Sequence, residues 1–62
     1  MTRYQITVVS EAEYDRVELE GGYPLETLAG HVDTDRGLTA AMVEGVQRFG
    51  PSAQVTHEEE LD

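Results

Sequence analysis

A nearly continuous apolar stripe between positions 38 and 49 is the sequence feature that most constrains the fold. Its members recur three and four residues apart, which is the spacing of one face of an α-helix. Gly50-Pro51 follows directly and is a strong stop signal, with glycine at the left-handed cap and proline just beyond it. The spacing therefore predicts a helix over 38–49 that needs a covering surface. The stripe consists of Leu38, Ala41, Met42, Gly45, Val46 and Phe49.

Two positions in this helix carry further information. Thr39 fits the N-cap position, although an earlier start at Asp33 or Thr34 stays open. Gly45 costs about 1 kcal/mol of helix propensity relative to alanine. We therefore interpret Gly45 as a packing residue, placed where the helix closely approaches another segment.

Two segments show the alternation that is typical of β-strands. In residues 3–9, Tyr4, Ile6 and Val8 fall on one face, and β-branched residues dominate. Residues 52–58 alternate in the same way. They predict a last strand that lies antiparallel or parallel to the first.

The segment from 10 to 20 carries two competing patterns. Ser10, with Glu13 three residues further on, matches a helix capping box. Against a helix, residues 17–20 alternate between apolar and acidic side chains and stop at a glycine pair, as a strand does. We favour a turn followed by a strand at about 14–20, paired with the first strand as a hairpin. A helix stays open as the alternative.

The next segment predicts a short helix near 24–30. Leu25, Leu28 and Val32 recur at helical spacing. Pro24 suits the first position of a helix, because the N–H that proline lacks has no partner there.

A chain of 62 residues has room for one domain and one small core. We therefore expect residues 1–62 to form a single small acidic domain in which 59–62 is a frayed tail. The predicted fold class is α+β: a sheet of about three strands (approximately 3–9, 14–20 and 52–58) packed on one main helix (approximately 38–49), with a short helix near 24–30.

The charge of the chain limits its partners. Thirteen acidic residues face four arginines and no lysine, which gives a formal net charge of -9. Binding to a nucleic-acid backbone needs clustered basic residues, and anionic membranes also repel acidic chains. We therefore expect no direct nucleic-acid partner and no membrane partner. The acidity serves either solvation, in ordinary or salt-rich cytoplasm, or a basic protein partner.

Cysteine usage and hydropathy set further limits. Without cysteine, neither disulfides nor thiolate metal sites can stabilise the small core, so oligomerisation stays open. No apolar run approaches the roughly 20 residues that span a bilayer, and the N-terminal residues lack a signal-peptide pattern. We expect a cytoplasmic protein.

Three potential metal ligands, His31, Asp33 and Asp35, alternate in an expected loop at 31–35. As a calcium-binding loop the frame fails, because its sixth position holds Leu38 where the sharp turn needs glycine. Ordinary turn chemistry before a helix explains the same residues. We assign no metal ligands and expect no cofactor. A small metal- or ligand-binding site in the 31–35 loop remains an alternative.

Catalytic patterns are weak throughout the sequence. Ser10 and Ser52 lack the context of an activated nucleophile. His57 precedes three glutamates, but the zinc-protease pattern needs a second histidine at the position of Leu61. We therefore expect that the protein is not an enzyme.

An acidic segment between two tyrosines is the best candidate for a binding surface. Tyrosine is enriched in interfaces because its large apolar ring carries a polar tip. On the expected strand, Glu18 and Glu20 would stand roughly 6–7 Å apart on one face and could meet a row of basic side chains. The predicted partner-binding residues are Tyr14, Asp15, Glu18, Glu20 and Tyr23.

These residues favour a small protein-interaction or regulatory module. In its specific form, the hypothesis is an inhibitor that presents carboxylates to a basic, nucleic-acid-binding protein in place of phosphates. Small inhibitors encoded by phages share this size and charge, but that is an analogy and not a shared motif. A homo-oligomeric structural protein is the alternative.

Overall fold

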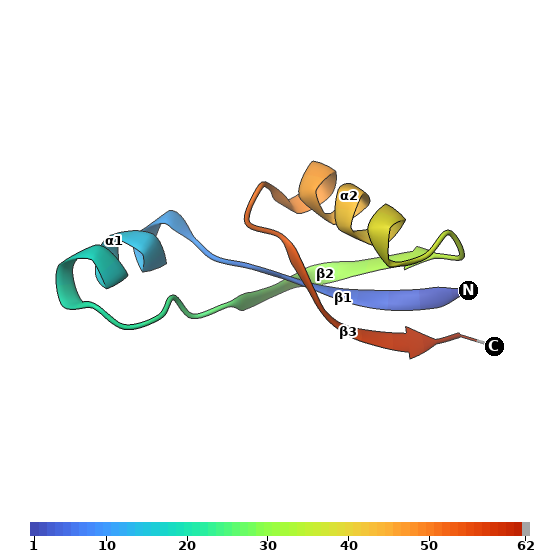
Figure 1. The fold of residues 1–62 in the computed structure, drawn as a ribbon, viewed down its shortest axis with the longest axis horizontal. Helices are drawn as coiled ribbons and strands as arrows, with labels where there is room; N and C mark the ends of the chain where they lie inside the picture. Colours follow the sequence, from blue (N-terminus) through green and yellow to red (C-terminus); the bar gives the residue numbers. More distant parts are fainter. Residues whose placement is uncertain (62) are drawn as a thin grey trace.

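The computed structural model of the chain describes residues 1–61, which form a three-stranded antiparallel sheet with one helix packed on it (Figure 1). The fold class is α+β, as predicted. The sheet order is β2-β1-β3, so the strand that comes first in the sequence lies in the centre. The elements are β1 (Thr2–Val8), α1 (Glu11–Glu20), β2 (Thr27–Thr34), α2 (Leu38–Phe49) and β3 (Gln54–Glu60).

The core lies between the sheet and α2. Within residues 1–61 the buried apolar side chains are those of Tyr4, Ile6, Val32 and Ala41. Ile6 and Val32 come from neighbouring strands and are fully buried, and Ala41 faces them from α2. Apolar residues alternate along β1 because one face of the sheet packs against the helix while the other faces solvent.

Helix α2 has the predicted bounds, and its two ends differ in how well the sequence described them. At the C-terminus, Gly50 adopts a φ of 106° and its N–H donates to the Val46 carbonyl, as the stop signal predicted. At the N-terminus, the cap is Gly37, not Thr39. Gly45 is a packing glycine: a Cβ there would lie 3.2 Å from Ile6 Cδ1, so the close neighbour is a side chain of β1.

Strand β3 pairs antiparallel with β1, and it both begins and ends two residues later than the predicted strand at 52–58. Glu59 and Glu60, expected at the start of a frayed tail, belong to this strand. Thr2 Oγ1 donates to the Glu60 carboxylate (2.8 Å), and the Leu61 N–H donates to the Met1 carbonyl (2.8 Å). Asp62, the remaining residue of the predicted tail, lies outside the described residues.

The predicted strand at 14–20 is wrong, because residues 11–20 form the helix α1. The capping signal was the correct one: Ser10 Oγ accepts a hydrogen bond from the Glu13 N–H (3.2 Å). The alternation of residues 17–20 was misleading for a physical reason. Burial would require the apolar residues of a helix to recur on one face, but α1 buries no side chain among the residues described. Its apolar residues therefore need not follow the helical period.

The predicted short helix near 24–30 is also wrong, because residues 27–34 form β2, an edge strand paired with β1. Val32 points into the core, whereas Leu25 and Leu28 are exposed, so their helical spacing does not define a common face. Gly30 lies where the Phe49 ring packs over the strand: a Cβ there would meet Phe49 Cζ at 2.8 Å.

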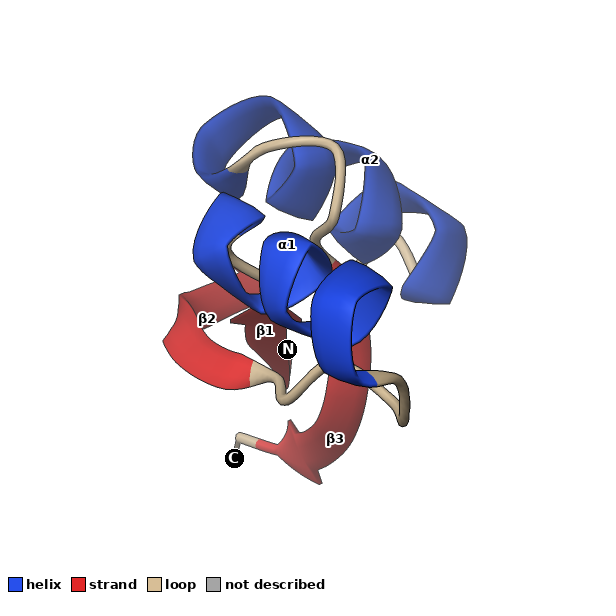
Figure 2. Ribbon diagram, turned by 90° about the vertical axis from the view of Figure 1, so that its left-hand side faces the viewer, coloured by secondary structure: helices blue, strands red, loops and turns tan. Residues whose placement is uncertain are grey.

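Residues 10–26, which we call the arm, project from the end of the β1–β2 ribbon. The molecule measures 44 × 18 × 15 Å, and α1 occupies one end of its long axis while the two termini lie near the other (Figure 1). Viewed from the arm, α1 stands in front of the sheet and α2 lies above and behind it (Figure 2). No other helix or strand in residues 1–61 packs against α1.

Candidate protein-binding arm

Helix α1 stands without a hydrophobic surface beneath it. It has ten residues, fewer than the roughly 12–15 at which an isolated helix becomes even marginally stable in water. Its apolar side chains point in different directions, since Tyr14 and Val17 lie on one side and Leu19 on another at about 100° per residue. Polar contacts must therefore hold the helix in place.

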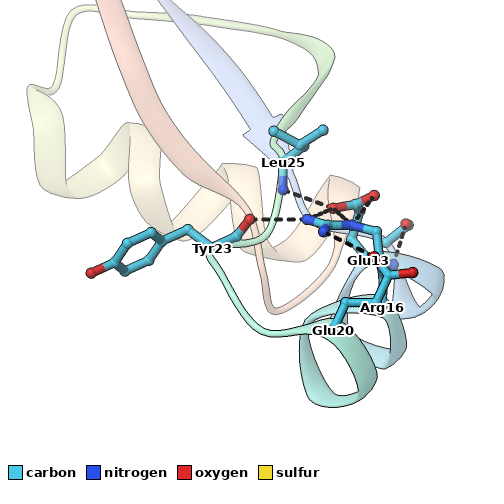
Figure 3. Close-up of polar contacts among 6 residues, drawn as sticks. Glu13, Arg16, Glu20, Tyr23 and Leu25 are labelled. Carbon is cyan, nitrogen blue, oxygen red and sulfur yellow. Dashed lines mark hydrogen bonds and ion pairs between the residues drawn. The ribbon is translucent and has the colours of Figure 1, made fainter.

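A polar clamp ties α1 to the chain that returns to the sheet (Figure 3). Glu13 Oε2 accepts hydrogen bonds from the Leu25 N–H (2.9 Å) and from Arg16 Nη2 (3.0 Å). Arg16 Nη2 also donates to the Tyr23 carbonyl (3.1 Å). Two side chains of α1 thus satisfy two backbone groups of the returning segment and fix the arm as one unit.

The side chains of this clamp carry opposite charges. The hydrogen bond from Arg16, and after it the one from the Leu25 N–H, hold the pKa of Glu13 below its ordinary value of 4.5. Arg16 also lies 3.8 Å from the Glu20 carboxylate. Such charge-assisted bonds are stronger than bonds between neutral groups, so the clamp is strongest where Glu13 is ionised.

The predicted site residues do not share one face of the arm. Glu18 and Glu20 are about 200° apart around α1, so the expected row of alternate carboxylates is wrong. Tyr14, Asp15 and Glu18 do lie together on one side, and Glu11 joins them one turn earlier. Glu20 is on the opposite side, against Arg16.

We call Glu11, Asp15 and Glu18 the acidic ridge. All three are exposed, and within residues 1–61 none of them takes part in an ion pair. Tyr14, one turn before Glu18, is half-exposed beside the ridge. The ridge therefore presents three uncompensated carboxylates next to an aromatic ring.

The returning segment adds a second aromatic residue. Tyr23 is 91 % exposed, and its ring points away from the clamp while its backbone carbonyl faces it (Figure 3). Leu19 at 86 % and Leu25 at 67 % are also largely exposed. The arm is a candidate binding element because Tyr23 adds a second exposed aromatic ring to the one that Tyr14 places beside the acidic ridge.

Sequence reasoning missed several residues of this arm. Glu13 and Arg16 were not assigned a role, although the capping pattern did mark Glu13 as a residue of a helix start. Glu11 and Leu19 were also missed. A helical projection of residues 11–20 would have placed Glu11 beside Asp15 and Glu18.

The alternative site at 31–35 loses its structural premise, because the segment as far as Thr34 is part of β2 and not a loop. Arg3 donates to both carboxylate oxygens of Asp33 (2.9 and 3.0 Å) on the uncovered face of the sheet. This guanidinium holds the pKa of Asp33 below its ordinary value of 3.8. No group of three or more metal-ligating side chains comes together in the part of the chain that the structure describes.

Comparison with protein-family models, with curated proteins and with solved structures found no match to this chain. Neither helix in residues 1–61 is long and apolar enough to cross a membrane. The candidate site therefore rests on its own geometry: a clamped helix that projects from a small sheet domain.

Proposed function

We propose that the protein is a small acidic interaction module whose arm binds a basic surface on a protein partner. One observation carries the proposal: α1 projects from the sheet and packs against no other element of residues 1–61, yet it is held in a fixed conformation by the clamp. A helix that contributes nothing to the core needs another reason to be kept in place.

The chemistry of the arm favours a partner rich in arginine or lysine. The acidic ridge places carboxylates four and seven residues apart on one side of α1, at axial distances of about 6 and 10 Å. Guanidinium groups pair well with carboxylates and also stack on aromatic rings. Tyr14 lies beside the ridge and could accept such a stacking arginine.

The clamp lowers the cost of binding. A disordered acidic segment would lose conformational freedom when it docked, whereas an arm that is already ordered loses less. Net charge adds to this effect, because a chain of charge -9 steers a basic partner toward itself at low ionic strength.

The inhibitor hypothesis is a specific form of this proposal. A partner that normally binds nucleic acid would meet the acidic ridge where it expects phosphates, and the arm would occupy its basic groove. A cytoplasmic location and the lack of catalytic activity belong to the same proposal.

The test is affinity capture from the native host with matched charge variants. Glu18→Arg reverses a charge in the ridge, and Asp35→Arg reverses an exposed charge at the far side of the sheet domain, with the same change in net charge. The partner captured by the parent chain should bind E18R at least about 10-fold more weakly and bind D35R nearly as well.

Salt provides the second readout. Binding should weaken steeply between low and high ionic strength, because exposed charges are screened over about 10 Å at 0.1 M salt. Equal losses for E18R and D35R would contradict the proposal, since binding would then depend on net charge and not on the arm. A salt-insensitive complex would contradict it as well.

A further inference from the structure

The base of the arm lies where β1 loses its neighbour on one side. The last pair between β1 and β3 joins Thr7 to Gln54, whereas β1 and β2 stay paired one residue further, at Val8 and Thr27. Beyond Thr7 the described residues form a ribbon of two strands, and the arm projects from its end (Figure 1). Two-stranded ribbons are only marginally stable and twist more strongly than wider sheets. Pairing between β1 and β2 therefore leaves the direction of the arm loosely defined.

Both ladders of the sheet also have an irregularity just before this ribbon. The pairing of β1 with β3 shifts its register between Gln5 and Ile6, and the pairing with β2 shifts between Ile6 and Thr7. Such a bulge bends the strand and raises its local twist. The sheet therefore changes direction next to Ile6, and the ribbon that carries the arm needs a further contact to hold it in one orientation.

The Ser52 hydroxyl supplies this contact. The Val9 N–H donates to Ser52 Oγ (3.1 Å), and the same hydroxyl donates to the Val9 carbonyl (3.2 Å). If the register of Thr7 and Gln54 is continued by two residues, Val9 and Ser52 stand opposite each other. One side chain thus takes the place of a backbone pair, because it satisfies both the donor and the acceptor of Val9 as a neighbouring strand would.

Ser52 belongs to the sheet domain and not to the arm. It lies in the turn between α2 and β3, where the Ala53 N–H donates to the Gly50 carbonyl (3.1 Å). Ser52 and Val9 are both half-buried. The contact therefore ties the last residue before the arm to the turn that follows α2.

We infer that Ser52 is the positioning residue of the arm, and that its hydroxyl fixes the direction in which residues 10–26 project from the sheet. The clamp holds the arm's own conformation, whereas Ser52 holds its orientation. The benefit of this orientation rests on the proposed function, since an arm already fixed against the sheet domain loses less freedom when a partner docks. The orientation itself can be measured without a partner.

Spin labels provide this measurement, because the chain has no cysteine and accepts labels only where a cysteine is introduced. Ala12→Cys on α1 and Thr39→Cys on α2 place two nitroxides at exposed helical positions, one on the arm and one on the sheet domain. Double electron–electron resonance then gives the distribution of distances between them in the full chain. The labelled parent should show one narrow distance. Ser52→Ala should lose that distance and give a broad distribution.

Two variants separate positioning of the arm from general stability. Ser52→Thr keeps the hydroxyl and should restore the narrow distance. Thr2→Val removes a hydroxyl hydrogen bond to Glu60 (2.8 Å) at the end of the sheet far from the arm, and should leave the distance unchanged. Hydrogen exchange adds an independent readout. The Val9 amide should exchange about 5-fold faster in S52A than in the parent, because it loses its hydrogen-bond acceptor.

Three results would overturn the inference. One is a narrow and unchanged distance in S52A. Another is equal broadening in S52A and T2V, which would show a loss of stability in the whole sheet. The third is a Val9 amide that exchanges at the rate of an unprotected amide in the parent chain, a result that does not depend on whether S52A folds. Failure to capture a partner from the native host would contradict the proposed function and leave these three measurements unaffected.

Discussion

Removal of the arm should leave the rest of the protein folded and make it slightly more stable. Val8 of β1 pairs with Thr27 of β2, and the connection between them, residues 9–26, is 18 residues long. Replacing residues 10–25 with Asn-Gly would leave a four-residue connection suited to a tight hairpin. Val9 would keep its two hydrogen bonds to the Ser52 hydroxyl (3.1 and 3.2 Å).

The expected gain follows from loop closure. Its entropic cost falls by about 0.6 kcal/mol for each halving of loop length, so shortening 18 residues to four contributes about 1.3 kcal/mol. No core contact is lost, because α1 packs against no other element within residues 1–61. For a domain of this size, that free energy corresponds to a rise in Tm of about 5–10 °C.

Thermal unfolding followed by circular dichroism, with the parent chain as reference, measures this change. The variant should unfold cooperatively at the higher temperature and should no longer capture the arm's partner. A loss of cooperative unfolding, or a fall in Tm of more than about 5 °C, would refute the reasoning. Such a result would mean that the arm supports the sheet domain and is not a separate binding element.

Three further predictions concern packing, the clamp and pH. Gly30→Ala should cost about 1–3 kcal/mol in urea unfolding, because its Cβ would lie 2.8 Å from the Phe49 ring. Gly45→Ala should change stability by less than about 1 kcal/mol, since the gain in helix propensity offsets a milder contact with Ile6. Equal losses of stability for the two substitutions would contradict the closer packing at Gly30. Glu13→Gln should reduce helical circular dichroism and leave the Tm of the sheet domain unchanged, whereas an unchanged helix signal would show that the clamp is dispensable. Three carboxyl groups have pKa values below their ordinary values because a neighbouring group stabilises the ionised form. Arg16 acts on Glu13 and Arg3 acts on Asp33. The Thr2 hydroxyl and the terminal amine act on Glu60. Their stabilisation is therefore present above pH 4.5 and is lost as the pH falls through the lowered pKa values. The Tm, measured at high salt to screen net repulsion, should fall below that pH, and a Tm that held constant or rose there would be contrary to this assignment.

Burial along one face explains why β1 and α2 could be predicted from the sequence. β1 and α2 touch the core along one face, so burial imposes alternation on residues 2–8 and helical spacing on residues 38–49. Gly50-Pro51 marked the end of α2 correctly because a left-handed glycine depends on the local backbone alone.

The two wrong predictions, for α1 and β2, have different causes, because α1 buries no side chain whereas β2 buries Val32 and Thr34. In α1 the clamp adds to the local N-cap at Ser10, and two of its partners, Glu13 and the Leu25 N–H, are twelve residues apart in the sequence. No periodicity in residues 11–20 reports such a contact. Edge strand β2 buries Val32 and shields Gly30 under Phe49, a packing that only the folded chain reveals.

Only part of the candidate site could be predicted from the sequence, because the positions of its side chains depend on the conformation of residues 11–20. Tyr14, Asp15 and Glu18 lie together because residues three and four positions apart are neighbours on a helix. Glu20 lies on the opposite side of the helix. The distribution of acidic residues along the sequence was enough to locate the acidic segment. The direction of each carboxylate follows from the helical conformation of residues 11–20.

The central position of β1 has a consequence for how the chain folds. This strand is synthesised first, yet its two neighbours come from residues 27–34 and 54–60, and Thr2 bonds to a residue 58 positions away. Topologies dominated by such distant pairings fold slowly, because chain entropy is lost before the contacts form. Until residue 60 has left the ribosome, β1 keeps an open edge. During that time β1 is exposed to pairing with other chains, so the net negative charge can keep nascent chains apart.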